Sequence, residues 1–175
     1  MSDKVAVMRE GILVEEDVPR NMYLRPRSAY TATFLGETNL IAGRVVKSSA
    51  GNGMCQVESA IGRLTCPVPQ WGKQQETIWI AYRPEGVNIT AADPQRQNVF
   101  PGHVKAAIFT GDQVIYKIEV QNQVLQAKTD PHCNFAHDEQ VFVELSPEKC
   151  LLIRREHEAI GGALDGGKSA AMRCQ

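Results

Sequence analysis

Apolar and polar residues alternate along much of this chain, and the alternation is clearest in two stretches that lie far apart. Residues 78–82 read IWIAY and residues 141–145 read VFVEL, so that a large apolar residue recurs at every second position. A two-residue period is typical of a β-strand with one buried face. Each stretch is followed shortly by a Pro-Glu pair, and a proline ends a strand ladder because it has no N–H to donate. We therefore predict two strands that end in the same way.

The two stretches belong to a longer internal repeat. Residues 43–46 (GRVV) correspond to residues 102–105 (GHVK), and residues 55–68 correspond to residues 116–129. The offset between equivalent residues grows from 59 at the glycines that open these segments to 63 at the two Pro-Glu pairs. The offset changes at turns and stays constant within predicted strands, which indicates a duplicated, strand-rich unit.

From Asn39 onward the sequence predicts β-structure almost throughout. Short β-prone runs are separated by turn residues at intervals of roughly 8–12 residues, a spacing typical of a small barrel or sandwich. The predicted strands are residues 39–47, 54–60, 63–68, 76–82, 86–90, 102–110, 113–121, 123–129, 140–146 and 149–154.

The first 36 residues follow a different pattern. Residues 5–8 and 12–14 are β-prone runs joined by a bend at Gly11, which predicts a hairpin. If this hairpin does not join a larger sheet, the outer edges of its strands are unpaired. We therefore expect its strands to be mobile or paired with each other.

Two short helices are predicted to follow the hairpin. Pro19 can open a first helix that ends before Pro26, because the residue before a proline avoids helical geometry. Ser28 can cap a second helix, and Gly36 can end it.

At the other end, residues 156–175 are rich in glycine and small residues and show no periodicity, which predicts a flexible tail.

Composition narrows the function classes. The chain of 175 residues has a formal net charge of −1 and a pI near 6.4. A protein that binds nucleic acid or anionic lipid usually carries a strongly basic patch, so we expect neither nucleic-acid binding nor direct membrane insertion. No apolar run approaches the ~20 residues of a spanning helix, and no secretory signal is visible.

The five cysteines do not show the spacing of a disulfide framework, which indicates reduced thiols. Three of them, Cys55, Cys66 and Cys150, lie at strand positions.

Two motifs suggest sites, and each has a simpler interpretation. Residues 162–169 match the phosphate-binding pattern GxxxxGK[ST], but such a loop needs a preceding strand and a following helix, and only six residues follow it. His132, Cys133 and His137 include zinc-ligand types, but a tetrahedral site needs a fourth ligand, usually from a second pair. We interpret the first as a coincidental match and the second as a connecting loop. No catalytic, cofactor-binding or metal-binding residues are predicted.

Arg83 and Glu85 flank Pro84 where a predicted strand ends. They could contact a ligand or a partner, or they could form a local ion pair that fixes the turn. The local ion pair is the simpler interpretation.

Residues 2–45 resemble the segment that follows the switch histidine in ATP-binding subunits of ABC importers. That pattern has a short strand, a Met-x-x-Gly turn, a helix between two prolines and a Phe-hydrophobic-Gly-x-x-Asn junction. Here these features are Asp3 to Val5, Met8 to Gly11, Pro19 to Pro26 and Phe34 to Asn39. Lys4 replaces the more usual Arg, and residues 15–17 (EED) depart from the common Gln-x-Gly.

Downstream, the sequence resembles the TOBE regulatory domain of the same subunits, most closely the polyamine, iron and maltose type. The resemblance rests on residues 83–85 (RPE), Gly102, residues 109–111, Tyr116 and the Pro-Glu pair at 147–148. It implies an all-β fold, an OB-like TOBE barrel of two interlocked repeats. Residues 1–36 would be a hairpin and helix remnant of the ATPase domain. Residues 37–155 would be the barrel, with repeats at about 39–90 and 102–154.

The resemblance also implies a function. The chain would be the non-catalytic regulatory and dimerisation domain of an importer ATP-binding subunit, lacking the ATPase core. ATP and Mg would bind only on that missing core. Its partners would be a second copy of itself and the membrane permease subunits, at the inner face of the cell membrane.

A second hypothesis is a stand-alone barrel that senses a small oxyanion, because the stretch from Asn39 to Val45 is similar to the opening of such barrels. Asn39, Arg83 and Glu85 are the residues we name as ligand or interface candidates.

Overall fold

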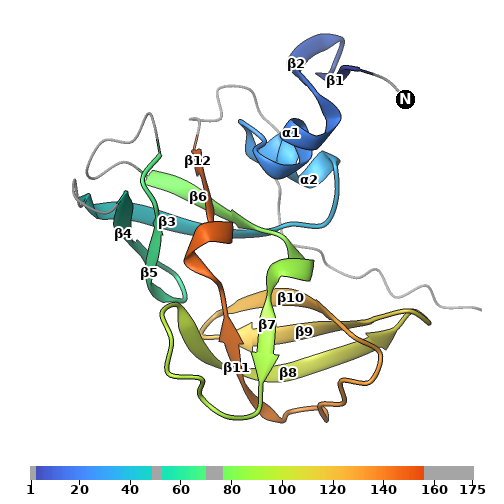
Figure 1. Ribbon diagram of the computed structural model, residues 1–175, viewed down its shortest axis with the longest axis vertical. Coiled ribbons are helices and arrows are strands. Elements are labelled where there is room, and N and C mark those ends of the chain that lie inside the picture. Colours follow the sequence, from blue (N-terminus) through green and yellow to red (C-terminus); the bar gives the residue numbers. More distant parts are fainter. Residues whose placement is uncertain (1–2, 49–52, 70–76, 156–175) are drawn as a thin grey trace, which may run out of the picture.

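The chain folds into two small sheets that share one core, with a short N-terminal segment attached to one side (Figure 1). The structure is a computed structural model that describes residues 3–48, 53–69 and 77–155. The strands are β1 Val5–Arg9, β2 Ile12–Asp17, β3 Asn39–Ser48, β4 Met54–Ser59, β5 Gly62–Pro67, β6 Thr77–Tyr82, β7 Asn88–Thr90, β8 Val99–Phe109, β9 Val114–Val120, β10 Gln123–Thr129, β11 Gln140–Glu144 and β12 Leu151–Arg154. The helices are α1 Pro19–Leu24 and α2 Ala29–Phe34, with 3-10 turns η1 Pro84–Gly86 and η2 Pro147–Lys149.

The order of the strands confirms two interlocked repeats. One five-stranded sheet has the order β12-β6-β3-β4-β5 and the other has the order β10-β9-β8-β11-β7. The first repeat supplies β3 to β7 and the second supplies β8 to β12, so each sheet takes its fifth strand from the other repeat. The exchanged strands are β7, which pairs with β11, and β12, which pairs with β6. The predicted all-β, OB-like fold is therefore confirmed.

The two repeats share irregularities as well as strands. In β3 the pairing register with β4 shifts between Val45 and Lys47, and in β8 the register with β9 shifts between Val104 and Ala106. The two shifts lie 59 residues apart, which is the offset of the glycines in the sequence repeat. A β-bulge bends its strand and increases the local twist, so each repeat curls its sheet at the same place.

The core is formed by the inward face of both sheets. The strands alternate buried and exposed positions, as the two-residue period predicts. The side chains that are fully buried in both repeats are mainly aliphatic, with Tyr82 and Tyr116 as the two large aromatic members. Cys55, Cys66 and Cys150 belong to this core as buried free thiols, as predicted.

The N-terminal segment forms the predicted hairpin and helices. Among the strands of the described residues, β1 and β2 pair with each other alone, as a two-stranded sheet, which confirms the expectation of self-pairing. Ser28 caps α2, because its hydroxyl accepts a hydrogen bond from the Thr31 backbone N–H at 3.0 Å. α1 begins at Pro19 and ends at Leu24, before Pro26.

A buried carboxylate joins the hairpin to the helices. Glu15, only 5% exposed, accepts the backbone N–H of Arg27 with both carboxylate oxygens, each at 3.2 Å. Glu15, one of the three residues that depart from the importer pattern at positions 15–17, therefore has a structural role here.

Four predicted boundaries were wrong by two residues or more, including that of the strand expected at 140–146, which ends at Glu144. The strands expected at 86–90 and 149–154 are shorter, because each is preceded by a 3-10 turn that starts at the proline of its Pro-Glu pair. The strand expected at 102–110 begins earlier, at Val99. The phosphate-loop match at 162–169 and the predicted flexible tail lie outside the described residues.

Candidate functional site

The three candidate residues lie in two different places. Asn39 lies at the start of β3, in the seam between the repeats, whereas Arg83 and Glu85 lie beside the N-terminal segment. The structure does not bring all three together.

Asn39 binds the backbone of the opposite repeat. Its side-chain amide donates to the Gln126 carbonyl at 2.8 Å, and its side-chain oxygen accepts the Gln126 N–H at 2.7 Å. These two bonds use both ends of the amide, and the residue is 7% exposed. The geometry is that of a clamp between strands.

A second asparagine forms the equivalent clamp, and sequence reasoning missed it. Asn98 donates to the Thr65 carbonyl at 2.8 Å and accepts the Thr65 N–H at 2.7 Å. It also donates to the Leu145 carbonyl at 3.0 Å. Asn39 and Asn98 are 59 residues apart, so the repeat offset contained the signal that could have found the pair.

Arg83 reaches across to the N-terminal segment. Its Nη1 atom lies within hydrogen-bond distance of the carbonyls of Ala32 (2.9 Å), Gly36 (3.1 Å) and Glu37 (3.2 Å). The same atom donates to the Thr38 hydroxyl at 2.6 Å, and Nη2 donates to the Tyr23 carbonyl at 3.1 Å. The guanidinium also stacks on the Tyr23 ring, 4.1 Å from its centroid.

Glu85 binds the same tyrosine and not Arg83. The Tyr23 hydroxyl donates to Glu85 Oε1 at 2.7 Å. This hydrogen bond, with a smaller contribution from burial, raises the pKa of Tyr23, because ionised tyrosine would lose the bond and face a carboxylate. The predicted local ion pair between Arg83 and Glu85 is wrong, because both side chains turn toward the N-terminal segment.

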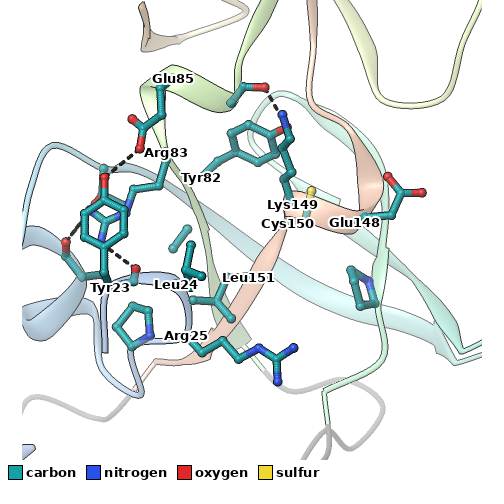
Figure 2. A pocket seen from close by; sticks show the side chains of 16 residues that line it. Tyr23, Leu24, Arg25, Tyr82, Arg83, Glu85, Glu148, Lys149, Cys150 and Leu151 are labelled. Carbon is teal, nitrogen blue, oxygen red and sulfur yellow. Dashed lines mark hydrogen bonds between the residues drawn. The ribbon is translucent and has the colours of Figure 1, made fainter. Parts of the chain in front are cut away.

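A pocket of about 550 Å³ lies beside these contacts (Figure 2). One wall comes from the N-terminal segment and the other comes from the barrel. The residues that line it are Tyr23, Leu24, Arg25, Pro26, Ala32, Thr38, Pro67, Ala81, Tyr82, Arg83, Glu85, Gly86, Glu148, Lys149, Cys150 and Leu151. Its wall is largely apolar, and Figure 2 shows Leu24 and Leu151 between the charged side chains at the rim.

The thiols and the histidine-containing loop are the other groups that the sequence singled out. A hydrogen bond with Cys150 and burial raise the pKa of the Cys66 thiol, and burial raises that of Cys55, so both stay protonated. His132, Cys133 and His137 lie in the loop between β10 and β11. Among residues 3–48, 53–69 and 77–155, no group of three or more His, Cys, Asp or Glu side chains is arranged to hold a metal ion.

Neither helix of the described residues has the length and apolarity that crossing a membrane requires. The site therefore consists of contacts between the N-terminal segment and the barrel of the same chain.

Comparison with known proteins finds one matching domain family and several similar import proteins. The TOBE domain family matches residues 80–153. The Chromobacterium violaceum protein named spermidine/putrescine import ATP-binding protein PotA is 30% identical over 134 residues, which are 75% of this chain and 37% of that protein. The PotA protein of Thermotoga maritima is 29% identical over 164 residues, which are 87% of this chain and 44% of that protein. The Fe(3+) ions import ATP-binding protein FbpC of Brucella suis is 32% identical over 122 residues, which are 70% of this chain and 33% of that protein.

A structural relative supports the fold. The cytoplasmic molybdate-binding protein ModG, solved with molybdate bound, superposes with a TM-score of 0.60 at 12% identity, over 66% of this chain and 95% of that chain. At this identity the likeness concerns the fold alone. The chain spans less than half the length of these import ATP-binding proteins. Residues 80–153 thus match the TOBE domain family, and most of the chain is similar to part of the ATP-binding proteins of ABC importers.

Proposed function

We propose that this chain serves as the regulatory and dimerisation domain of an ABC importer ATP-binding subunit. The observation that carries the proposal is the similarity to polyamine and ferric-ion import ATP-binding proteins over 70–87% of the chain. ATP and Mg would bind on an ATPase domain, and the TOBE barrel itself would catalyse nothing. The partners would be a second copy of the chain and the membrane permease subunits, at the inner face of the cell membrane.

The exposed apolar surface supports a junction with an ATPase domain. Of the eleven exposed large apolar side chains among the described residues, eight belong to the segment before residue 36, and they are Met8, Ile12, Leu13, Val14, Val18, Tyr23, Leu24 and Phe34. A two-stranded hairpin with such a surface is marginally stable alone in water. We infer that residues 1–36 pack against that domain in the complete subunit.

Dimerisation through the barrel would have a mechanical use. Two ATPase domains held by a lasting contact meet at a high effective concentration, so that closure on ATP becomes a hinge motion within one assembly. A signal received by the barrel could then change how the two domains close.

A graft tests the function. Residues 1–155 would replace the matching part of the Thermotoga maritima protein, and transport-coupled ATP hydrolysis would be measured in reconstituted importer. We expect coupled hydrolysis to persist in the graft and to be lost when the same part is deleted. A graft that behaves like the deletion would overturn the proposal.

The oxyanion sensor remains the second candidate, favoured by the fold shared with a molybdate-binding protein. The seam residue that suggested it, Asn39, is bound to the Gln126 backbone. A thermal-shift panel with molybdate, sulfate and spermidine tests it. Ligand at about 100 times its Kd stabilises by about 2.7 kcal/mol. Each kcal/mol should raise the Tm by roughly 2–4 °C. A shift with molybdate would favour the sensor.

A further inference from the structure

Arg83 binds the C-terminal ends of both short helices. Ala32 lies in the last turn of α2 and Tyr23 in the last turn of α1, and Arg83 donates to the carbonyls of both. The last carbonyls of a helix have no partner within the helix, and they carry the negative end of its dipole. A guanidinium supplies five donors in a fixed plane, so one side chain can serve two helix ends at once.

Tyr23 is held from two sides. The Arg83 guanidinium covers its ring at 4.1 Å, while Glu85 accepts its hydroxyl hydrogen at 2.7 Å. Arg83 and Glu85 both extend from the short stretch where β6 ends and η1 begins, so one segment of the barrel binds both the ring and the hydroxyl of Tyr23 (Figure 2).

Among the described residues, other contacts between the segment and the barrel include an apolar cluster and an exposed ion pair. Ala32 packs in a small apolar cluster with Ala81 and Ile153. Glu37 and Lys128 form an ion pair at 3.0 Å with 49% and 24% of their side chains exposed, which contributes little. The 550 Å³ pocket is lined by both parts, so their described side chains do not fill the space between them at this place.

We propose that Tyr23, Arg83 and Glu85 form a latch that sets the orientation of residues 5–36 on the barrel. When the latch opens, the segment moves as a unit while the barrel stays folded. Only the use of the latch rests on the proposed function. In that function the latch would couple events on the barrel to an attached ATPase domain.

Hydrogen exchange of the full chain tests the latch without any importer present. The variants are Arg83→Ala, Arg83→Lys, which keeps the charge but loses the planar fork, and Tyr23→Phe, which keeps the stacked ring but loses the bond to Glu85. The matched control is Arg63→Lys, because Arg63 bonds Glu58 on the barrel surface at 3.1 Å, away from the segment.

We expect Arg83→Ala and Arg83→Lys to speed amide exchange in α1 and α2 by roughly tenfold or more, with a smaller effect of Tyr23→Phe. Exchange in β8 to β11 should not change in any variant, and Arg63→Lys should match the parent. Unchanged exchange in α1 and α2 would overturn the latch. An equal increase in β8 to β11 would overturn it too, because it would show general destabilisation. The graft experiment can succeed or fail whichever of these exchange results is obtained, so the latch and the proposed function are tested separately.

Discussion

At the scale of single residues, two asparagines connect the repeats. Each amide lies at the start of one repeat and binds a backbone N–H and C=O in an edge strand of the other, which are Gln126 in β10 for Asn39 and Thr65 in β5 for Asn98. A primary amide is suited to this position because it presents one acceptor and two donors on one flat group. Asn98 has a φ of 57°, a left-handed conformation that asparagine tolerates better than most residues.

Removing the Asn98 amide should be costly. Asn98→Ala leaves the Thr65 N–H and the Thr65 and Leu145 carbonyls without their partner in a buried site. We expect a loss of about 2–4 kcal/mol in the free energy of unfolding, measured by urea denaturation. Asn39→Ala should cost less, because Asn39 makes two such bonds.

The control is Asn134→Ala, in an exposed loop position, which should change stability by less than about 0.5 kcal/mol. An Asn98→Ala variant as stable as this control would show that the clamp is dispensable.

The Tyr23 hydroxyl gives stability a dependence on alkaline pH. Its pKa is raised above the ordinary value of 10.0, chiefly by the hydrogen bond to Glu85. The neutral form is therefore favoured in the folded chain, and this contribution is fully present below pH 10 and is lost as the pH rises through the raised pKa. Absorbance titration of tyrosinate should show one late-ionising tyrosine fewer in Tyr23→Phe, while Tyr82, whose pKa burial raises to about 12, still ionises late. A titration of that variant that matches the parent would contradict this assignment.

At the scale of elements, each repeat places a glycine where two strands cross closely. A Cβ at Gly43 would lie 2.8 Å from Val57 Cγ1, and a Cβ at Gly102 would lie 2.8 Å from Ile118 Cγ2 and 2.9 Å from the Glu119 carbonyl. Each glycine lies two residues before the bulge of its strand. Because glycine has no side chain, the long strand β3 can bend closely over β4, and β8 can bend closely over β9.

Gly102→Ala should therefore destabilise the fold. The added methyl overlaps a backbone carbonyl as well as side chains, so the strand itself must shift. We expect a loss of about 1–3 kcal/mol by thermal or urea unfolding. Ala107→Ser, at an exposed position of the same strand, is the control and should be nearly neutral. Equal stability of the two variants would show that the strand has room to adjust.

At the scale of the whole molecule, the exchange of β7 and β12 makes the two repeats mutually dependent. Each sheet is completed by a strand of the other repeat, and both sheets contribute to one core. Neither repeat can bury its apolar face alone, so we infer that the barrel unfolds as one unit.

Self-association of the intact chain is the prediction at this scale. Sedimentation velocity should show a reversible dimer that forms through the barrel. Phe109 is the most exposed large apolar side chain in the described part of the barrel, at 67%, and Phe109→Glu should weaken the dimer. Ile12→Glu, on the hairpin and equally exposed at 67%, should leave it intact. If only Ile12→Glu abolished association, the contact would lie on the N-terminal segment.

The sequence by itself determined the parts of the fold that depend on local chemistry. Alternation located the strands, Ser28 and Pro19 located the helix starts, and the 59-residue offset between the glycines revealed the duplication. These features were predictable because burial of one strand face, capping and proline geometry act over a few neighbouring residues.

Only the tertiary structure decided the partners of side chains. The strand exchange between repeats, the asparagine clamps across 87 and 33 residues, and the reach of Arg83 over 60 residues to Tyr23 have no local signature. Arg83 and Glu85 are close in sequence, so a local ion pair was the natural prediction, yet Arg83 binds carbonyls at the ends of two helices and Glu85 binds a tyrosine hydroxyl. Long-range contacts depend on which surfaces the packed core brings together, and that is not fixed by the spacing of residues along the chain.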